Sequence, residues 1–177
     1  MKKVISKEHL LAALLIILGL ATRFVPHLPN FTAIGAVAFF AGRYLPAKYS
    51  LTIPLAIMLA SDLFIGFYGL PIMFSVYLSF ALMVIIGYTT QQKGWKKIAT
   101  GTIIGSTIFF LVTNWAVWAF GTMYNANLNG LITSYFAALP FFRNQLLADI
   151  FYTTVLVGGY EFIQLFTTQT QLQKNPE

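Results

Sequence analysis

Six long apolar runs divide the sequence, and short segments rich in Pro, Gly, Asn and Lys separate them. The runs cover about residues 10–25, 31–44, 51–67, 71–89, 98–120 and 145–166. A helix needs about 20 mainly apolar residues to cross the hydrocarbon core of a bilayer. The runs also lack the period-two alternation of a membrane β-barrel. The pattern therefore predicts an all-α membrane protein, a single bundle of six transmembrane helices over residues 1–177.

Two segments fit this pattern less simply. The run at 31–44 is short for a full crossing, so we expect it either to tilt among partner helices or to be extended by its polar flanks. The segment 121–144 is the one long connection, and its apolar part is expected to lie across the membrane face or dip into it. Pro140 falls between two runs here, where the missing N–H of a proline costs least.

Composition narrows the class of protein. Hydrophobic residues make up 58% of the chain and charged residues 9%, against about 45–50% and 25% in an ordinary soluble domain. The net charge of +6 comes from scattered short clusters. Such clusters track phosphates poorly, so we exclude nucleic acid as a partner. The chain has no cysteine, which removes disulfides and thiolate metal sites, and we predict neither a metal nor a resident cofactor.

Positively charged residues predict how the bundle is oriented, because Lys and Arg are retained on the cytoplasmic side. With both termini cytoplasmic, all of the 11 Lys and Arg except Arg23 and Arg143 fall inside. The inner residues are Lys2, Lys3, Lys7, Arg43, Lys48, Lys93, Lys96, Lys97 and Lys174. A basic N-terminus followed by an apolar run is also typical of a signal peptide, but the five further runs favour a first membrane helix.

Strongly polar side chains gather at one depth once the runs are oriented this way. At about 1.5 Å per residue, four of them lie roughly 6–9 Å below the outer boundary. They are Asp62, Tyr77, Asn114 and Asp149, and Arg23 lies just above them. An Asp or Arg at the centre of a membrane helix costs about 2.5–3.5 kcal/mol. Either an internal ion pair such as Arg23–Asp62 locks the bundle, or the layer belongs to a ligand pocket open to the outside.

Aromatic residues beside this layer favour the pocket, because aromatic walls hold planar small molecules while a few polar groups fix their orientation. For Trp118 an aromatic belt at the membrane interface is the alternative, and for Trp115 both interpretations stay open. His27 lies in a stiff connection between two prolines, where an exposed histidine without a role is the alternative. The candidate substrate-binding residues are Arg23, His27, Asn30, Asp62, Tyr77, Asn114, Trp115, Trp118, Asn144 and Asp149.

Several stretches carry a resemblance to a known family. They include Arg23, Pro26-His27, Pro29-Asn30-Phe31-Thr32, Ile34-Gly35-Ala36, Pro54-Leu55, Ser61-Asp62, Val76-Tyr77, Thr113-Asn114, Val117-Trp118, Pro140-Phe141-Phe142, Asn144 and Asp149. In these stretches the chain resembles a family of small bacterial membrane proteins labelled as transport proteins. That family is similar to the S components of energy-coupling factor (ECF) vitamin transporters.

The resemblance implies a multi-pass protein of the bacterial inner membrane that captures a vitamin from the outer side. It also implies a membrane partner energised by an ATPase. The nearest functional comparison is the solitary branch that transports cobalamin, so cobalamin or a related compound is the expected substrate. Two features depart from these relatives. The cobalamin branch is associated with a cobalt-ligating cysteine, which this chain lacks, and Ala12 and Ala13 are followed by Ile16 and Ile17 where many S components have an Ala-x-x-x-Ala docking pair.

The sequence thus predicts a membrane subunit that binds a small vitamin-like substrate and is not an enzyme. It lacks a G-x-x-x-x-G-K-[ST] phosphate loop, so work driven by ATP belongs to another protein. One alternative is a carrier that acts alone, in which an intramembrane aspartate exchanges a proton or ion. The other is an intramembrane enzyme that pairs Asp62 with Asp149. That alternative is disfavoured because H-E-x-x-H is absent and the two histidines lie near opposite membrane faces.

Overall fold

The computed structural model describes residues 7–174, and the side chains of residues 8–167. It contains the helices α1 (Lys7–Phe24), α2 (Ile34–Tyr44), α3 (Ala47–Ser50), α4 (Thr52–Ile65), α5 (Leu70–Thr89), α6 (Trp95–Phe120) and α7 (Leu128–Lys174). No strand occurs in this described part, which confirms the predicted all-helical class. Lys2 and Lys3, predicted to be cytoplasmic, lie outside the described residues, as do the side chains of Lys7 and Lys174.

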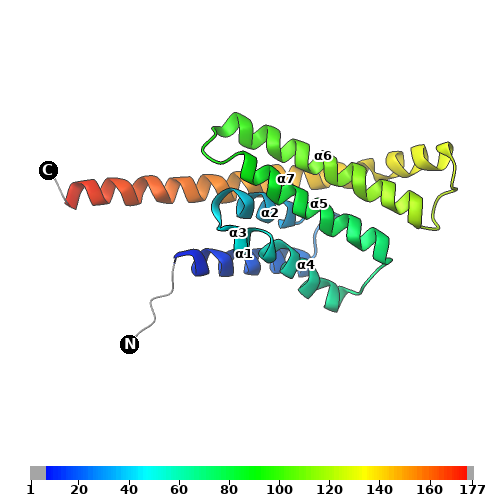
Figure 1. Ribbon diagram of the computed structural model, residues 1–177, viewed down its shortest axis with the longest axis horizontal. Helices are drawn as coiled ribbons and strands as arrows, with labels where there is room; N and C mark the ends of the chain where they lie inside the picture. Colours follow the sequence, from blue (N-terminus) through cyan, green and yellow to red (C-terminus); the bar gives the residue numbers. More distant parts are fainter. Residues whose placement is uncertain (1–6, 175–177) are drawn as a thin grey trace.

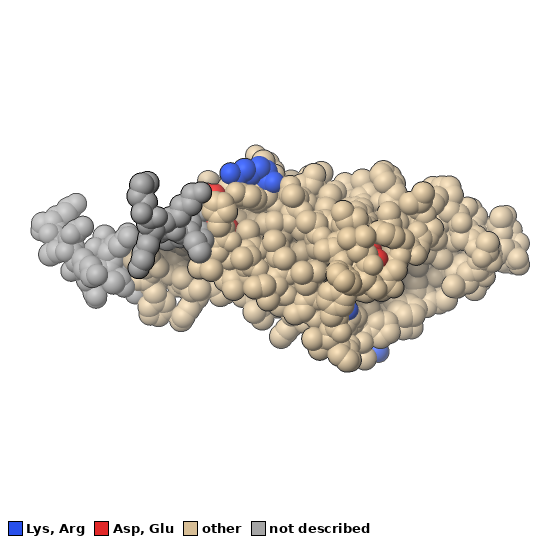
Figure 2. Space-filling model, turned by 90° about the horizontal axis from the view of Figure 1, so that it is seen from below, with Lys and Arg blue, Asp and Glu red and all other residues tan. Residues whose placement is uncertain are grey.

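Four helical segments are long and apolar enough to cross a membrane by length and composition. They are Ala47–Ile65, Leu70–Thr89, Trp95–Phe120 and Leu128–Thr167. Large apolar side chains on them face outward, as Phe64 and Phe136 do with 81% and 68% exposed. Charged atoms are sparse over the face of the molecule in Figure 2. These features indicate a helical membrane protein, because lipid rather than water accommodates such a surface.

The other two predicted spans are less typical of membrane helices. Helix α1 has 18 residues and carries Lys7, Glu8 and Arg23. Helix α2 has 11 residues and is therefore about 17 Å long, roughly half the thickness of a 30 Å hydrocarbon core. By length, α2 does not cross a membrane.

Helix α2 instead forms the centre of the bundle. All its residues from Ile34 to Arg43 are buried, and it packs against α4, α5 and α7 (Figure 1). Its sequence is apolar around its whole circumference, which is typical of a helix enclosed on all sides. Small residues let backbones approach closely, and a Cβ added at Gly42 would overlap the Val84 carbonyl oxygen, while one at Gly87 would overlap that of Phe39. The α2–α5 contact thus depends on glycine on both helices.

The segment predicted as a long connection is mostly helical, so that prediction is wrong. Only Gly121–Asn127 joins α6 to α7, and residues 128–144 form the first part of the continuous 47-residue helix α7, with Pro140 inside it. A proline removes one helical hydrogen bond, and membrane helices tolerate this when neighbouring groups satisfy the freed carbonyl. Helix α7 therefore continues on both sides of Pro140.

The Lys and Arg residues at the helix ends are distributed unevenly between the two ends of the bundle. The start of α1, the ends of α2 and α5, α3, the start of α6 and the end of α7 all lie at one end of the bundle, on the left in Figure 1. We call this the basic end, because it carries Arg43, Lys48, Lys93, Lys96 and Lys97. At the opposite end lie the end of α1 and the α4–α5 and α6–α7 connections.

Candidate binding cavity

A cavity of about 510 Å³ lies towards the end of the bundle opposite the basic end, since Arg23 near the end of α1 and Ile65 at the end of α4 line it. Its volume is within the range of about 300–1,000 Å³ typical of small-molecule sites. Helices α1, α2, α4, α5, α6 and α7 all contribute to it. The lining residues are Arg23, His27, Asn30, Thr32, Gly35, Met58, Ile65, Tyr68, Ile72, Val76, Phe80, Phe109, Phe110, Thr113, Asn114, Val117, Ala138, Phe141, Phe142, Gln145 and Asp149.

On one side of the cavity, Arg23 of α1 forms an ion pair with α4. Its Nη2 donates to Asp62 Oδ1 at 2.6 Å, and the Tyr77 hydroxyl donates to the other carboxylate oxygen at 2.9 Å. Asp62 is only 1% exposed and Arg23 17% exposed. A buried carboxylate needs such partners, because an uncompensated buried charge is strongly destabilising. The Arg23–Asp62 ion pair that the sequence suggested as one alternative is therefore present. Its arginine also lines the cavity.

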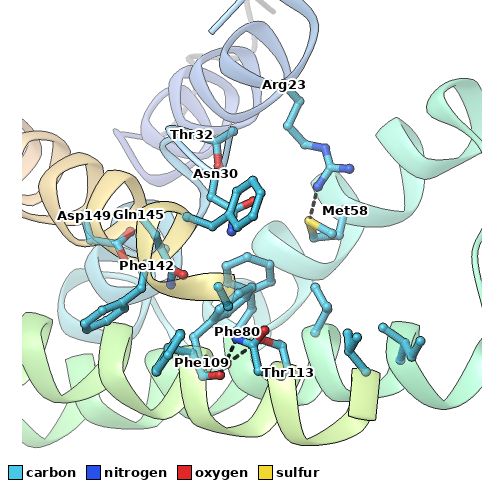
Figure 3. Close-up of a pocket in the computed structure, with 18 of the residues that line it drawn as sticks. Arg23, Asn30, Thr32, Met58, Phe80, Phe109, Thr113, Phe142, Gln145 and Asp149 are labelled. Carbon is cyan, nitrogen blue, oxygen red and sulfur yellow. Dashed lines mark hydrogen bonds between the residues drawn. The ribbon is translucent and has the colours of Figure 1, made fainter. Parts of the chain in front are cut away.

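The bonding of Arg23 is incomplete. Nη1 donates to the Met58 thioether at 2.7 Å, and sulfur is only a weak acceptor. The buried Nε has no hydrogen-bond partner among the described residues. Figure 3 shows Arg23 and Met58 together at one margin of the cavity. The cation is thus neutralised by Asp62 but retains N–H donors that no strong acceptor uses.

Asp149 of α7 lies on the opposite side of the cavity, beside Gln145 (Figure 3). It is 1% exposed. The Ser106 hydroxyl donates to its Oδ2 at 2.7 Å, and Gln145 also hydrogen-bonds to it. A Cβ added at Gly35, in the first turn of α2, would overlap this carboxylate. The carboxylate therefore lies against the N-terminus of α2, where the helix dipole favours negative charge.

The two aspartates do not form a pair. Asp62 is bonded to Arg23 and Tyr77, whereas Asp149 is bonded to Ser106 and Gln145. Only Asp149 lines the cavity. The arrangement gives two separate polar groups on opposite sides, rather than two carboxylates that share a proton.

Phenylalanines rather than tryptophans form the wall between these polar sides. The rings of Phe80 and Phe109 are 5.0 Å apart, and those of Phe110 and Phe142 are 4.6 Å apart. Asn114 also lines the cavity, and its Nδ2 donates to the Phe110 carbonyl oxygen at 2.8 Å. The amide oxygen of Asn114 remains as an acceptor within an aromatic surface.

Five of the ten predicted site residues are not among the residues that line the cavity. Asp62 and Tyr77 are bonded to or through the Arg23 ion pair rather than facing the cavity, and the other three lie farther along α6 and α7. Trp115 is 48% exposed and packs edge-to-face on Phe120. The indole N–H of Trp118 donates to the Asn125 carbonyl oxygen, which fastens the α6–α7 connection. Asn144 donates to the Pro29 carbonyl oxygen at 3.1 Å, and so holds the connection that carries His27 and Asn30 against α7.

His27 and Asn30 themselves line the cavity from that connection. His27 Nδ1 lies 2.7 Å from the Leu28 carbonyl oxygen. Because a carbonyl only accepts, Nδ1 carries the proton and donates. Asn30 has a φ of 62°, a left-handed conformation that asparagine tolerates better than most residues. It turns the chain from the end of α1 back towards α2.

Sequence reasoning did not find Gln145, Thr113 or Tyr68. Gln145 precedes Asp149 by one helical turn, and side chains at this spacing meet on one face, so the spacing was a usable signal. No such spacing pointed to Tyr68, because it lies in the short α4–α5 connection. Burial, aided by the negative charge of Asp62 and opposed by Arg23, raises the pKa of Tyr68 to about 12.

Residues 3–172 match a protein family described as a family of unknown function, DUF6580. The chain belongs to this family. The match includes every helix that lines the cavity. No curated protein and no solved structure matches the chain.

Among the residues that the structure describes, no three His, Asp or Glu side chains gather as metal ligands would. The polar groups of the cavity are instead hydrogen-bonding groups and single charges. Their arrangement, few and set in an apolar wall, is typical of a site that orients an organic molecule.

Proposed function

We propose that this DUF6580 protein is a membrane subunit that binds a small organic molecule for uptake into the cell. The observation that carries the proposal is the cavity, in which Arg23 and Asp149 lie on opposite sides of a space walled by phenylalanines. Charged side chains within a membrane bundle are costly and usually functional. The resemblance to vitamin-binding S components supports the same function.

The orientation that we propose places the basic end in the cytoplasm of a bacterium, with the protein in the inner membrane. Lys48, Lys93, Lys96 and Lys97 would then obey the retention of positive charge on the inner side. The cavity would lie in the outer half of the bilayer. In this arrangement α2 is a half-length helix enclosed by five membrane-embedded helices, and the six predicted segments all lie within the membrane.

A vitamin-like compound is the substrate that we propose; cobalamin or a related compound is the candidate that the resemblance suggests. Movement of the substrate across the membrane needs a source of energy. The resemblance favours a membrane partner energised by an ATPase, since the chain has no phosphate loop of its own. The substrate itself would be recognised by this chain.

Binding to the purified protein tests this proposal. The protein in nanodiscs is screened against a panel of vitamins and their precursors, and melting temperature and equilibrium binding are measured. We expect at least one compound to bind and to raise the melting temperature. Ala138→Phe should abolish that binding because the new ring fills the cavity, which Ala138 lines. Ala137→Phe is the matched control, since this neighbouring alanine is exposed on the outer face of the same helix.

Two results would contradict the proposal. One is a complete panel in which no compound changes melting. The other is a compound whose binding survives Ala138→Phe as well as Ala137→Phe, since it would then bind elsewhere.

Asp149 favours a second candidate, a carrier coupled to protons. It is a buried carboxylate whose described partners, Ser106 and Gln145, are uncharged, and buried membrane carboxylates of this kind often relay protons. In proteoliposomes without any ATPase, a proton gradient should then drive accumulation of the substrate, and Asp149→Asn should stop it. Accumulation only when an ATPase partner is added would exclude this candidate.

A further inference from the structure

The polar groups of the cavity restrict the charge of its ligand, provided that the cavity binds one as proposed above. Arg23 has five N–H donors. Its Nη2 is used by Asp62, its Nη1 contacts only the Met58 sulfur, and its Nε has no partner among the described residues. Nε is buried, but Arg23 lines the cavity. A ligand oxygen or nitrogen that reaches the exposed part of its guanidinium would therefore accept a stronger hydrogen bond than the Met58 sulfur does.

The acceptor should be uncharged. Arg23 is already paired with Asp62 at 2.6 Å, and that carboxylate is fixed by the Tyr77 hydroxyl and almost completely buried. An anionic ligand would have to enter beside this carboxylate and would lose its own hydration. Repulsion between two negative charges is strong at short distance in a medium of low dielectric constant.

The opposite side of the cavity offers acceptors. Asp149 is negative when ionised and lies beside the Gln145 amide (Figure 3). These groups favour a ligand N–H or O–H. A full positive charge is not required, because the N-terminus of α2 lies against Asp149 and already compensates its charge in part. A cationic ligand would therefore gain less from Asp149 than it loses in hydration.

The wall between the two sides selects the shape of the ligand. The Phe80–Phe109 and Phe110–Phe142 pairs present ring surfaces with centroids 5.0 and 4.6 Å apart. Aromatic faces of this kind stack on planar ring systems.

From these contacts we infer that the cavity selects an electroneutral, planar ring compound, which accepts a hydrogen bond from Arg23 and donates one to the Asp149–Gln145 side. Aromatic amides and lactam-type heterocycles belong to this class. The corresponding carboxylates and amidines do not.

A matched set of three probes tests the inference. 2-Naphthamide, 2-naphthoate and 2-naphthamidine share one planar body and are neutral, anionic and cationic at neutral pH. Binding of each to the full-length protein in nanodiscs is measured by calorimetry or ligand-observed NMR. We expect the amide to bind wild type about tenfold or more tightly than either ion, a difference of about 1.4 kcal/mol.

Asp62→Asn then tests the reason for the selection. The substitution keeps the shape of the side chain but leaves the charge of Arg23 uncompensated. Affinity for 2-naphthoate should rise about tenfold, and affinity for the amide should change little. Glu161→Gln is the matched control, because it also converts a carboxylate into an amide but lies beside Arg43 and Tyr44 at the basic end. It should change none of the three affinities.

The possible results separate this inference from the proposed function. Tightest binding of 2-naphthoate or 2-naphthamidine to wild type overturns the inference, and so does an equal effect of Asp62→Asn and Glu161→Gln on 2-naphthoate. Failure of the amide to bind a protein that does bind a compound of the vitamin panel overturns the inference alone. Failure of every probe and every panel compound overturns the proposed function as well. The ranking in wild type needs no variant, so it decides the matter even if Asp62→Asn does not fold.

Discussion

Arg23 and Arg43 are both largely buried in an apolar bundle, and in both the Nε has no partner among the described residues. Their surroundings differ. Arg43, at the basic end, donates to the carbonyl oxygens of Thr90 and Lys93 and pairs with Glu161 at 3.4 Å. It therefore bonds to backbone carbonyl oxygens of the α5–α6 connection and ties that connection to α2. Arg23 bonds to no carbonyl oxygen in the described contacts and borders a cavity.

The helix packing around the two arginines also differs. At the basic end, α2 and α5 meet backbone to backbone through Gly42 and Gly87. At the other end the helices separate around about 510 Å³ of space. A buried arginine in a membrane bundle can thus either tie down the connection between two helices or serve as a donor for a ligand. The number of backbone carbonyls within its reach distinguishes the two roles.

The largest effect should come from removing the close packing at the basic end. In Gly87→Ala, the added methyl group would overlap the Phe39 carbonyl oxygen. Since backbone cannot move aside as a side chain does, we expect a loss of more than about 3 kcal/mol and little folded protein by size-exclusion chromatography. In Gly159→Ala nothing lies within 4 Å of the new atom, so this control should fold normally. Normal melting of Gly87→Ala would show that α2 and α5 can separate without loss.

An intermediate effect is expected for Arg43→Gln. The variant loses charged hydrogen bonds to two carbonyl oxygens, but the glutamine amide can still donate a neutral one, so we expect a loss of about 1.5–3 kcal/mol in stability. We expect a clearly lower melting temperature, with the relative affinities for the three naphthyl probes unchanged in the folded fraction. Changed probe selectivity in this variant would mean that the two ends of the bundle do not act independently.

The smallest effect should follow Trp115→Phe. The indole is half-exposed on the outside of α6 and contacts Phe120, so stability should change by no more than about 0.5 kcal/mol. Probe affinities measured in the same nanodiscs should equal those of wild type. A tenfold loss of affinity would instead mean that Trp115 contacts the ligand, as the sequence predicted.

Much of the fold could be predicted from the sequence, because continuous apolar runs have few solutions other than membrane helices. The runs at 71–89 and 98–120 correspond closely to α5 and α6. The length of α7 was not predictable in the same way. A proline between apolar runs is as typical of a break as of a continued helix, and the surroundings of Pro140 decide between them.

Only part of the candidate site could be predicted from the sequence. Depth along each helix placed Arg23 just above the layer of Asp62, and the structure shows the two residues in contact. Depth does not determine rotation about the helix axis, however. Asn114 and Trp115 are neighbours in sequence, yet Asn114 lines the cavity and Trp115 lies outside it. Apolar surroundings within the bundle and lipid outside it place similar demands on an aromatic residue, so composition could not distinguish the two faces.

The unbroken course of α7 has a mechanical consequence. Asp149 and Glu161 lie on the same hydrogen-bonded rod, about 18 Å apart at 1.5 Å per residue. Such a rod is stiff along its length, so axial sliding or rotation of α7 at one residue is transmitted to the other. Both residues also contact α2. Asp149 lies beside Gly35, and Glu161 hydrogen-bonds to Arg43 and Tyr44. Displacement of α7 beside the cavity would therefore strain the contacts of Glu161 with Arg43 and Tyr44 at the basic end.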